Sequence, residues 1–133
     1  NRMLVAGTGN KIEDFGVGFY TKYGDGGVDL SPIADLLKSE VYALAEELGI
    51  SPSIIDAPPI DGLWSDNRTD EEQIGASYDE MEWAMREIAK KTKKNKLTLR
   101  QKQIMEIFMR FNSINKHKMK PIPVCVIPDA LKK

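Results

Sequence analysis

A chain of 133 residues, 41% of them hydrophobic, is long enough for a single domain with its own core, and we take residues 1–133 as one domain. One cysteine, Cys125, and one histidine exclude a disulfide framework and a Cys/His zinc cluster. The sequence has no apolar run of about 18 residues and no charged-then-apolar leader, so we expect neither a membrane span nor a signal peptide. A reducing, cytoplasmic setting is the default. The chain begins at Asn1, directly before an apolar run, as a fragment of a longer protein would.

The small net charge of −1 hides a division of charge along the chain. Residues 1–89 hold six basic and 18 acidic residues, whereas residues 90–133 hold 13 basic and two acidic ones. The densest basic cluster is formed by Lys90, Lys91, Lys93, Lys94 and Lys96. This region is expected to be a solvated linker or a surface that pairs with the acidic half. The alternative is that residues 90–120 bind nucleic acid or another polyanion.

The chain opens with a pattern typical of a strand followed by a ligand-binding turn. The apolar run 3–6 predicts a buried strand, and Gly7-Thr8-Gly9 predicts a turn at its carboxyl end. The crevice beyond such strand ends is where open α/β sheets bind ligands. The stretch from Gly16 to Gly27 has five glycines, which predicts an ordered loop whose backbone approaches a ligand or another chain.

The clearest predicted helix runs from Pro32 to Leu48. Ser31 is a favourable N-cap, Pro32 suits the first helical position, and Gly49 suits the position that ends a helix. Apolar residues recur at helical spacing, namely Ile33, Leu36, Leu37, Val41, Leu44, Ala45 and Leu48. We expect one face of this helix to pack on a sheet or on another helix.

Capping signals predict the remaining helices. Ser51-Pro52 predicts a short turn, and Thr69-x-x-Glu72 a short helix that ends near Gly75. Ser77-x-x-Glu80 opens a helix with Tyr78, Met81, Ala84, Met85 and Ile88 on one side, and Thr98-x-x-Gln101 a long helix with Ile104, Ile107, Phe108 and Phe111 inward. Three prolines after residue 120 predict a tail extended across a surface. One βα unit followed by helices is less than a whole doubly wound sheet.

Two groups near the N-terminus could carry chemistry. Thr8 and the backbone amides beside it suit an adenine or a ribose, and Glu13 could hold a metal, although Gly-Thr-Gly is also common in plain turns. The second group is the glycine-rich loop, which carries Lys22, Asp25 and Asp29. A ligand site would explain this set of charges, and a hairpin turn at Asp25-Gly26 is the alternative.

Two further positions raise questions of placement. His117 and Lys118 lie in a basic segment that ends at a proline, where a lone histidine is more often structural than catalytic. Lys38 lies near the start of the predicted helix, where the helix dipole disfavours a cation. A nearby phosphate would explain this lysine, and so would a side chain that reaches solvent.

Taken together, these groups resemble one family, the NAD synthetases, in the C-terminal part of the ammonia-dependent type. The similarity is specific from Leu4 to Tyr78 and looser in the basic region. It rests on the runs Leu4–Lys11 with Glu13, Gly18–Asp29, Leu30–Lys38, Pro58-Pro59 to Leu63-Trp64, Asp70–Glu72 to Gly75–Tyr78, and His117-Lys118 before Pro121.

The resemblance implies an α/β fold of the adenine-nucleotide-hydrolase-like (Rossmann-like) type with a parallel sheet, here only its C-terminal part with several helices. It implies a ligase that uses ATP and Mg²⁺ and is typically a homodimer. ATP adenylates the nicotinate carboxylate of deamido-NAD, pyrophosphate leaves, and ammonia displaces AMP to give NAD. The ammonia could be taken free or come from glutamine in a separate domain.

Carried over by position, the resemblance also implies roles for single residues. Thr8 resembles an ATP contact, Glu13 a magnesium ligand, and Lys38 the lysine that supports the α-phosphate of ATP during adenylation. Asp25 resembles the carboxylate that receives or deprotonates ammonia. Contacts to deamido-NAD are implied for Lys22, Asp29, His117 and Lys118.

Two departures from the family pattern matter. Ile60 follows the proline pair where many members have Thr or Ser, so a hydroxyl contact to ATP is lost there. The family's Ser-Gly-Gly-x-Asp-Ser pyrophosphate loop, which also supplies a second magnesium ligand, does not occur in the sequence. We therefore expect that the N-terminal half is missing and that the chain alone is inactive. The nearest rival enzymes, GMP and asparagine synthetases, are disfavoured by the Lys-Tyr-Gly-Asp-Gly-Gly run at 22–27.

Overall fold

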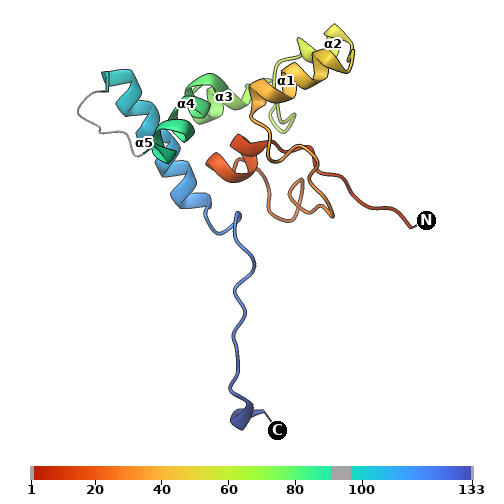
Figure 1. The fold of residues 1–133 in the computed structure, drawn as a ribbon, viewed down its shortest axis with the longest axis vertical. Coiled ribbons are helices and arrows are strands. Elements are labelled where there is room, and N and C mark those ends of the chain that lie inside the picture. The colour runs from red at the N-terminus through yellow and green to blue at the C-terminus, as the bar shows by residue number, and fades with distance from the viewer. Residues whose placement is uncertain (1, 91–96, 133) are drawn as a thin grey trace.

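Short helices joined by long loops make up the computed structural model, which describes residues 2–90 and 97–132 (Figure 1). Lys91, Lys93, Lys94 and Lys96 of the basic cluster lie outside the described residues. In chain order the elements are the π-helix η1 (Ile12–Val17), α1 (Lys38–Glu47), α2 (Pro52–Ile55), α3 (Asp70–Ile74), α4 (Tyr78–Ala89), α5 (Leu99–Asn115) and the 3₁₀-helix η3 (Asp129–Leu131).

The core forms where η1, α4 and α5 pack together. Its most buried side chains come from all three elements: Ile12 and Val17 from η1, Met81 and Ala84 from α4, and Ile104 and Phe108 from α5. The predicted inward faces of α4 and α5 are therefore confirmed, except that Ile88 near the end of α4 is 38% exposed. The core holds η1 in place, and η1 carries Glu13 and Asp14.

The capping boxes set the helix starts as the sequence predicts. The side chains of Thr69, Ser77 and Thr98 each accept a hydrogen bond from the backbone three residues on. Gly75 ends α3 with a φ of 84°, in the left-handed region that glycine adopts without steric cost. The short helix α2 begins at Pro52, directly after Ser51.

The helix predicted from Pro32 to Leu48 is shorter than expected, because α1 begins only at Lys38. Residues 32–36 form turns instead, and the carbonyl of Leu36 accepts a hydrogen bond from the backbone N–H of Lys11 at 2.8 Å rather than from a helical partner. The carboxylate of Glu40 then caps the N–H of Leu37 at 2.7 Å. The carboxyl end is as predicted, with Gly49 at a φ of 68°.

The expected packing of this helix is found only in part, because α1 contacts α2 and α4 but buries little against them. No residue of α1 is buried, and Leu48 directly after it is 68% exposed. In Figure 1, α1 and α2 lie together at one end of the molecule, away from α5. The apolar face that the sequence shows is thus only partly covered, by α2 and α4, among the described residues.

The buried strand predicted at residues 3–6 is not found. Within the described ranges there is no strand, only a single parallel bridge between Ala6 and Leu30. Met3 is 78% exposed and Leu4 71%. The physical reason is that a strand needs partners along its length, whereas here only the short segment ending at Leu30 lies beside it.

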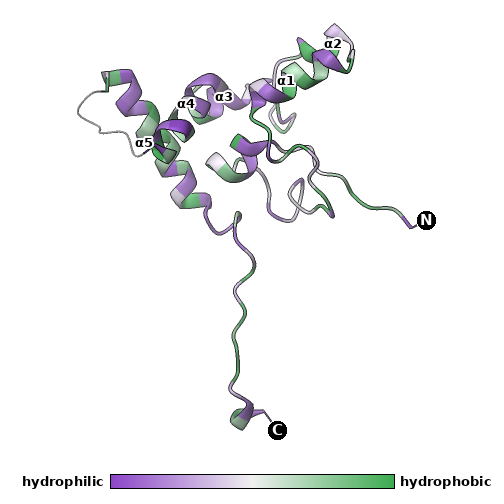
Figure 2. Cartoon of the chain, in the orientation of Figure 1, coloured by the Kyte–Doolittle hydropathy of each residue, from purple (hydrophilic) through white to green (hydrophobic). Residues whose placement is uncertain are grey.

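The tail is extended, as its prolines predict, but it does not lie across a surface. Figure 1 shows it running away from the helices, and Figure 2 shows that much of it is hydrophobic. Val124 is 80% exposed and Val126 82%. Among the helices that the structure describes, none is both long and apolar enough to cross a membrane.

Candidate functional site

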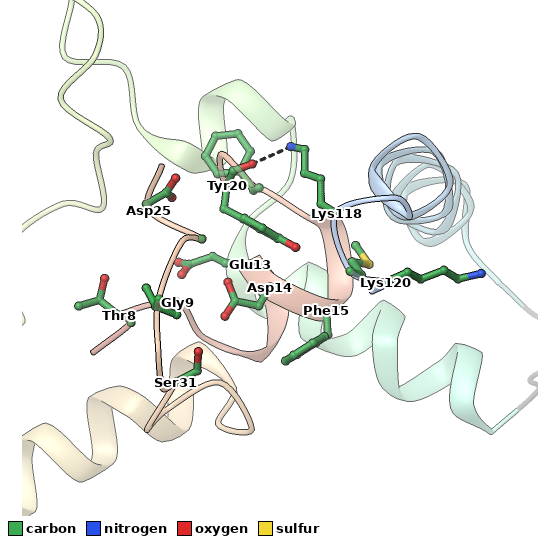
Figure 3. Close-up of a pocket in the computed structure, with 15 residues that line it drawn as sticks. Thr8, Gly9, Glu13, Asp14, Phe15, Tyr20, Asp25, Ser31, Lys118 and Lys120 are labelled. Atoms are coloured by element: carbon green, nitrogen blue, oxygen red, sulfur yellow. Dashed lines mark hydrogen bonds between the residues drawn. The ribbon is translucent and has the colours of Figure 1, made fainter. Parts of the chain in front are cut away.

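An open pocket of about 250 Å³ lies among the Gly7-Thr8-Gly9 turn, η1, the glycine-rich loop and the segment after α5 (Figure 3). It is smaller than the roughly 300–1,000 Å³ of typical ligand pockets, so it could hold part of a nucleotide rather than two nucleotides end to end. The side chains that supply polar groups to it are Thr8, Glu13, Asp14, Tyr20, Asp25, Ser31, Lys118 and Lys120.

The π-helix η1 owes its position to Asn10, which is only 2% exposed. Its amide oxygen accepts hydrogen bonds from the N–H groups of Ile12 at 2.9 Å and Glu13 at 3.2 Å. In return, Oε2 of Glu13 accepts one from the N–H of Asn10 at 3.2 Å. This is a capping box with asparagine in place of serine or threonine, and that signal in the sequence could have predicted η1.

Glu13 is held by two more groups at its other carboxylate oxygen. The hydroxyl of Tyr78 donates to Oε1 at 2.6 Å, and Nζ of Lys38 donates to it at 3.3 Å. The ammonium group of Lys38 also lies 4.8 Å from the centre of the Tyr78 ring. Lys38 is the first residue of α1, and the carboxylate and ring face compensate for its unfavourable place at a helix N-terminus.

Asp70 lies behind Tyr78, and no local pattern in the sequence predicts its contact with the site. Its Oδ2 is 3.2 Å from the Tyr78 hydroxyl, and its Oδ1 is buried with no hydrogen-bond partner among the described residues. Burial is the main cause that raises the pKa of Asp70, and burial also raises the pKa of Tyr78, with the Glu13 charge next. Tyr78 has a single proton to donate, so the shorter bond to Glu13 takes it.

Asp14 is another site residue that was not predicted from the sequence. Burial, followed by the charges of Glu13 and Asp25, raises the pKa of Asp14 to about 6. Figure 3 shows its carboxylate projecting into the pocket near Gly9. A Cβ atom on Gly9 would meet that carboxylate, so a larger residue there would require the Asp14 side chain to move. The acidic pair at 13–14, directly after the turn, was the available signal.

Two lysines join the glycine-rich loop to the segment after α5 through hydrogen bonds. Lys118 donates to the carbonyls of Gly18 at 3.0 Å and Tyr20 at 2.7 Å. Lys22 reaches the opposite way and donates to the carbonyls of His117 at 2.7 Å and Lys120 at 3.4 Å. Both ammonium groups are therefore bound to backbone in this state.

Asparagines of α5 continue this contact toward the core. Asn112 donates to the carbonyl of Gly16 at 2.8 Å, and Asn115 to that of Val17 at 2.8 Å. Together with Lys118, they satisfy successive carbonyls at the end of η1, which a helix leaves without partners. The three side chains are three residues apart, so they share one side of α5 and the turn after it.

The predicted site residues fall into two sets. Thr8, Glu13, Asp25 and Lys118 line the pocket, and Lys38 adjoins it through Glu13. The carboxylate of Asp25 accepts a hydrogen bond from the N–H of Thr21 at 2.7 Å, within the loop turn.

Lys22, Asp29 and His117 do not line the pocket. Asp29 is exposed and accepts a hydrogen bond from the N–H of Val5 at 2.8 Å, which ties the first segment to the loop. His117 is exposed too, with Nδ1 3.1 Å from the carbonyl oxygen of Ile114. Their hydrogen bonds are to backbone groups.

The described residues contain no group of three or more His, Cys, Asp or Glu side chains that could hold a metal ion. Mg²⁺ is commonly held in enzymes by one or two carboxylates together with substrate phosphates. Glu13 and Asp14 fit that smaller requirement, because both line the pocket and a cation would offset the repulsion between them, which adds to burial in raising the pKa of Asp14.

Known proteins match most of the chain. The family model described as NAD synthase matches residues 1–122. The NH(3)-dependent NAD(+) synthetase of Archaeoglobus fulgidus is 42% identical over 128 residues, covering 96% of this chain and 49% of that protein. That of Syntrophomonas wolfei is 53% identical over 79 residues, covering 59% and 31%. The chain spans at most about half the length of these relatives.

Two solved structures share the fold. NMN synthetase from Francisella tularensis is 28% identical with a TM-score of 0.73, covering 95% of this chain and 47% of that one. The NH3-dependent NAD synthetase from Campylobacter jejuni, in complex with the nitrate ion, is 26% identical with a TM-score of 0.65, covering 92% and 45%. The chain belongs to the NAD synthase family.

Proposed function

We propose that the complete protein to which this chain belongs is an ATP-dependent ligase that amidates deamido-NAD to NAD. The observation that carries the proposal is the meeting of Thr8, Glu13, Asp25 and Lys118 at one pocket, in a chain of the NAD synthase family. Ammonia is the proposed nitrogen donor, because the relatives are named as NH(3)-dependent enzymes.

The reaction needs activation of the carboxylate because ammonia cannot displace oxide from it. One oxygen of the nicotinate carboxylate attacks the α-phosphorus of ATP, and pyrophosphate leaves with its electron pair. Ammonia then attacks the acyl carbon, loses a proton, and expels AMP. AMP is a far better leaving group than oxide, so two easier steps replace one that is prohibitively slow.

Lys38 is the proposed support for the charge on the α-phosphate. Its side chain is 20% exposed and is paired with Glu13. Because the ammonium group lies between a carboxylate and an aromatic face, it is oriented before a phosphate arrives. Preorganised charge of this kind is among the largest contributions to catalysis.

Asp25 is the proposed acceptor of the proton that ammonia releases. It lies on the glycine-rich loop at the pocket, and its Oδ1 is already fixed by the N–H of Thr21. The second oxygen stays available, since a carboxylate can accept several hydrogen bonds. Thr8, which also lines the pocket, is the proposed ATP contact.

Glu13, with Asp14 beside it, is the proposed holder of Mg²⁺, which would offset phosphate charge when bound. Lys22, Asp29, His117 and Lys118 are the proposed contacts to deamido-NAD. Lys22 and Lys118 would have to exchange their carbonyl partners for the ligand, or act by keeping the loop closed.

Features of the whole protein are part of the same proposal. Residues 4–7 and 28–30 would join a parallel Rossmann-like sheet, for which the bridge between Ala6 and Leu30 is the starting register. Residues 1–133 would belong to one domain, and the protein would act as a cytoplasmic homodimer. The chain alone would be inactive, because the sequence has no Ser-Gly-Gly-x-Asp-Ser loop to bind pyrophosphate.

The test is product analysis with the complete protein, ATP, Mg²⁺ and ammonia. With deamido-NAD we expect NAD, AMP and pyrophosphate in equal amounts. A second candidate substrate is nicotinate mononucleotide, because one structural neighbour is named an NMN synthetase. Preference for the mononucleotide would support that second function, and formation of ADP and phosphate would refute adenylation.

A further inference from the structure

A buried tyrosine outside the pocket contacts both the proposed Mg²⁺ ligand, Glu13, and the proposed α-phosphate contact, Lys38. Tyr78 is 6% exposed, and it does not line the pocket. Its hydroxyl donates to Oε1 of Glu13 at 2.6 Å, while the centre of its ring lies 4.8 Å from Nζ of Lys38. Among the described residues, no other both donates a hydrogen bond to this carboxylate and places an aromatic ring beside this ammonium group.

Tyr78 is itself held in place by its burial and by its backbone. It is the first residue of α4, and its N–H donates to Oε1 of Glu71 at 2.7 Å. At the other end, Oδ2 of Asp70 lies 3.2 Å from its hydroxyl. The phenol therefore lies buried between α3 and η1, where its orientation is fixed.

The contacts of Glu13 explain what the tyrosine adds. Without Tyr78, Oε1 of Glu13 would keep only Lys38, at 3.3 Å. That partner is the cation proposed to move onto a phosphate when ATP binds. The tyrosine hydroxyl is neutral and stays in place, so it can hold the carboxylate while Lys38 leaves. Partners of this kind orient a metal ligand, and their loss typically costs about 10–100-fold in metal affinity or activity.

We propose that Tyr78 is a positioning residue that holds the Glu13 carboxylate and the Lys38 ammonium group in the arrangement that Mg²⁺ and ATP require. The inference rests on the proposed function and adds to it a residue that touches neither substrate. Its role follows from geometry, since one side chain fixes the two groups by different interactions, a hydrogen bond and a ring contact.

The experiment compares three variants of the complete protein. Tyr78→Phe keeps the ring beside Lys38 but removes the hydroxyl from Glu13. Tyr42→Phe is the matched control, because the Tyr42 ring lies 6.0 Å from Lys38 and its hydroxyl has no hydrogen bond among the described residues. Asp70→Asn changes the buried partner of Tyr78 while leaving the bond to Glu13 possible. Thermal unfolding of each variant reports damage to the fold.

The readouts are calorimetric ATP binding at graded Mg²⁺ concentrations and the rate of pyrophosphate release. We expect Tyr78→Phe to raise the Mg²⁺ concentration for half-maximal ATP binding about 10-fold or more, and the two controls to change it less than about 3-fold. Pyrophosphate release at saturating substrates should slow in Tyr78→Phe, with the KM for deamido-NAD nearly unchanged. Equal Mg²⁺ dependence in Tyr78→Phe and Tyr42→Phe would overturn the inference, and so would an equal shift in Asp70→Asn.

A spectroscopic measurement covers the case in which Tyr78→Phe does not fold. The hydroxyl proton of Tyr78, protected in a short hydrogen bond, should give a resonance in the wild-type protein that shifts when Mg²⁺ and ATP are added together. The resonance should differ in Glu13→Gln. A resonance whose chemical shift changes neither with the ligands nor with the substitution would overturn the inference. A wild-type protein that fails to bind ATP would instead overturn the proposed function itself.

Discussion

Replacing Gly18 with alanine tests the contact between η1 and α5 that holds the pocket together. Gly18 ends η1 with a φ of 65°, and an added Cβ would lie 2.5 Å from Cβ of Asn115 and 2.9 Å from Cε of Met119. The end of α5 cannot simply retreat, because Asn115 and Lys118 bond to the carbonyls of Val17 and Gly18. The substitution must therefore either strain the backbone or break those bonds.

The magnitude can be worked out from two contributions. A left-handed conformation costs an alanine about 1–2 kcal/mol, and overpacking costs typically about 1–3 kcal/mol more, so the total is about 2–5 kcal/mol. Gly49 supplies the matched control, because it has a φ of 68° but nothing within 4 Å of an added Cβ. Gly49→Ala should therefore cost only the first contribution.

Denaturant unfolding of the complete protein provides the measurement. Gly18→Ala should lower the free energy of unfolding by about 1–3 kcal/mol more than Gly49→Ala does. Gly62 is a second control, with a φ of 67° and equally open space around it. If Gly18→Ala were no more damaging than Gly49→Ala, the close approach of α5 to η1 would be refuted.

Three further predictions concern the charged groups. Folding raises the pKa of Asp14 from 3.8 to about 6, so the folded state binds this proton more tightly and loses stability as pH rises from about 4 to about 6. Asp14→Asn should therefore raise the free energy of unfolding by about 1 kcal/mol above pH ~6, after allowance for solvent screening, and should not raise it below pH ~4. Denaturant unfolding that showed equal gains at both pH values would contradict this. In Asp25→Asn the new side chain can still accept a hydrogen bond from the N–H of Thr21. In quenched-flow assays pyrophosphate release should therefore persist while NAD formation slows about 10²-fold. Equal losses in both rates would indicate that Asp25 only stabilises the turn. Lys38→Ala should slow adenylation about 10²-fold, and an unchanged maximal rate with only a raised KM would refute its role.

The parts of the fold that could be predicted from the sequence are those fixed by local chemistry. The boxes at Thr69, Ser77 and Thr98 join side chains to backbone only three residues away, so their helix starts are as predicted. The predicted start of α1 was wrong because the true start depends on a residue that is distant in the sequence. The N–H of Lys11 donates a hydrogen bond to the carbonyl of Leu36, and no local pattern in residues 31–38 predicts this contact.

The site divides in the same way. Thr8, Glu13 and Asp25 could be found because the motif of the family carries them. Asp70 and Tyr78 could not be assigned a place beside Glu13, since 57 or more residues of chain separate them from it and only tertiary packing brings them together. The opposite failure occurs at residues 3–6, where the pattern predicts a strand but the partners that would bury it are not present among the described residues.

The central claim is that the carboxylate is activated by transfer of AMP. Deamido-NAD labelled with heavy oxygen in its nicotinate carboxylate tests this directly when it reacts with ATP, Mg²⁺ and ammonia on the complete protein. Because one carboxylate oxygen bonds to the α-phosphorus and leaves with AMP, mass spectrometry should find one labelled oxygen in each AMP formed. AMP without label, or label in released phosphate, would contradict the account.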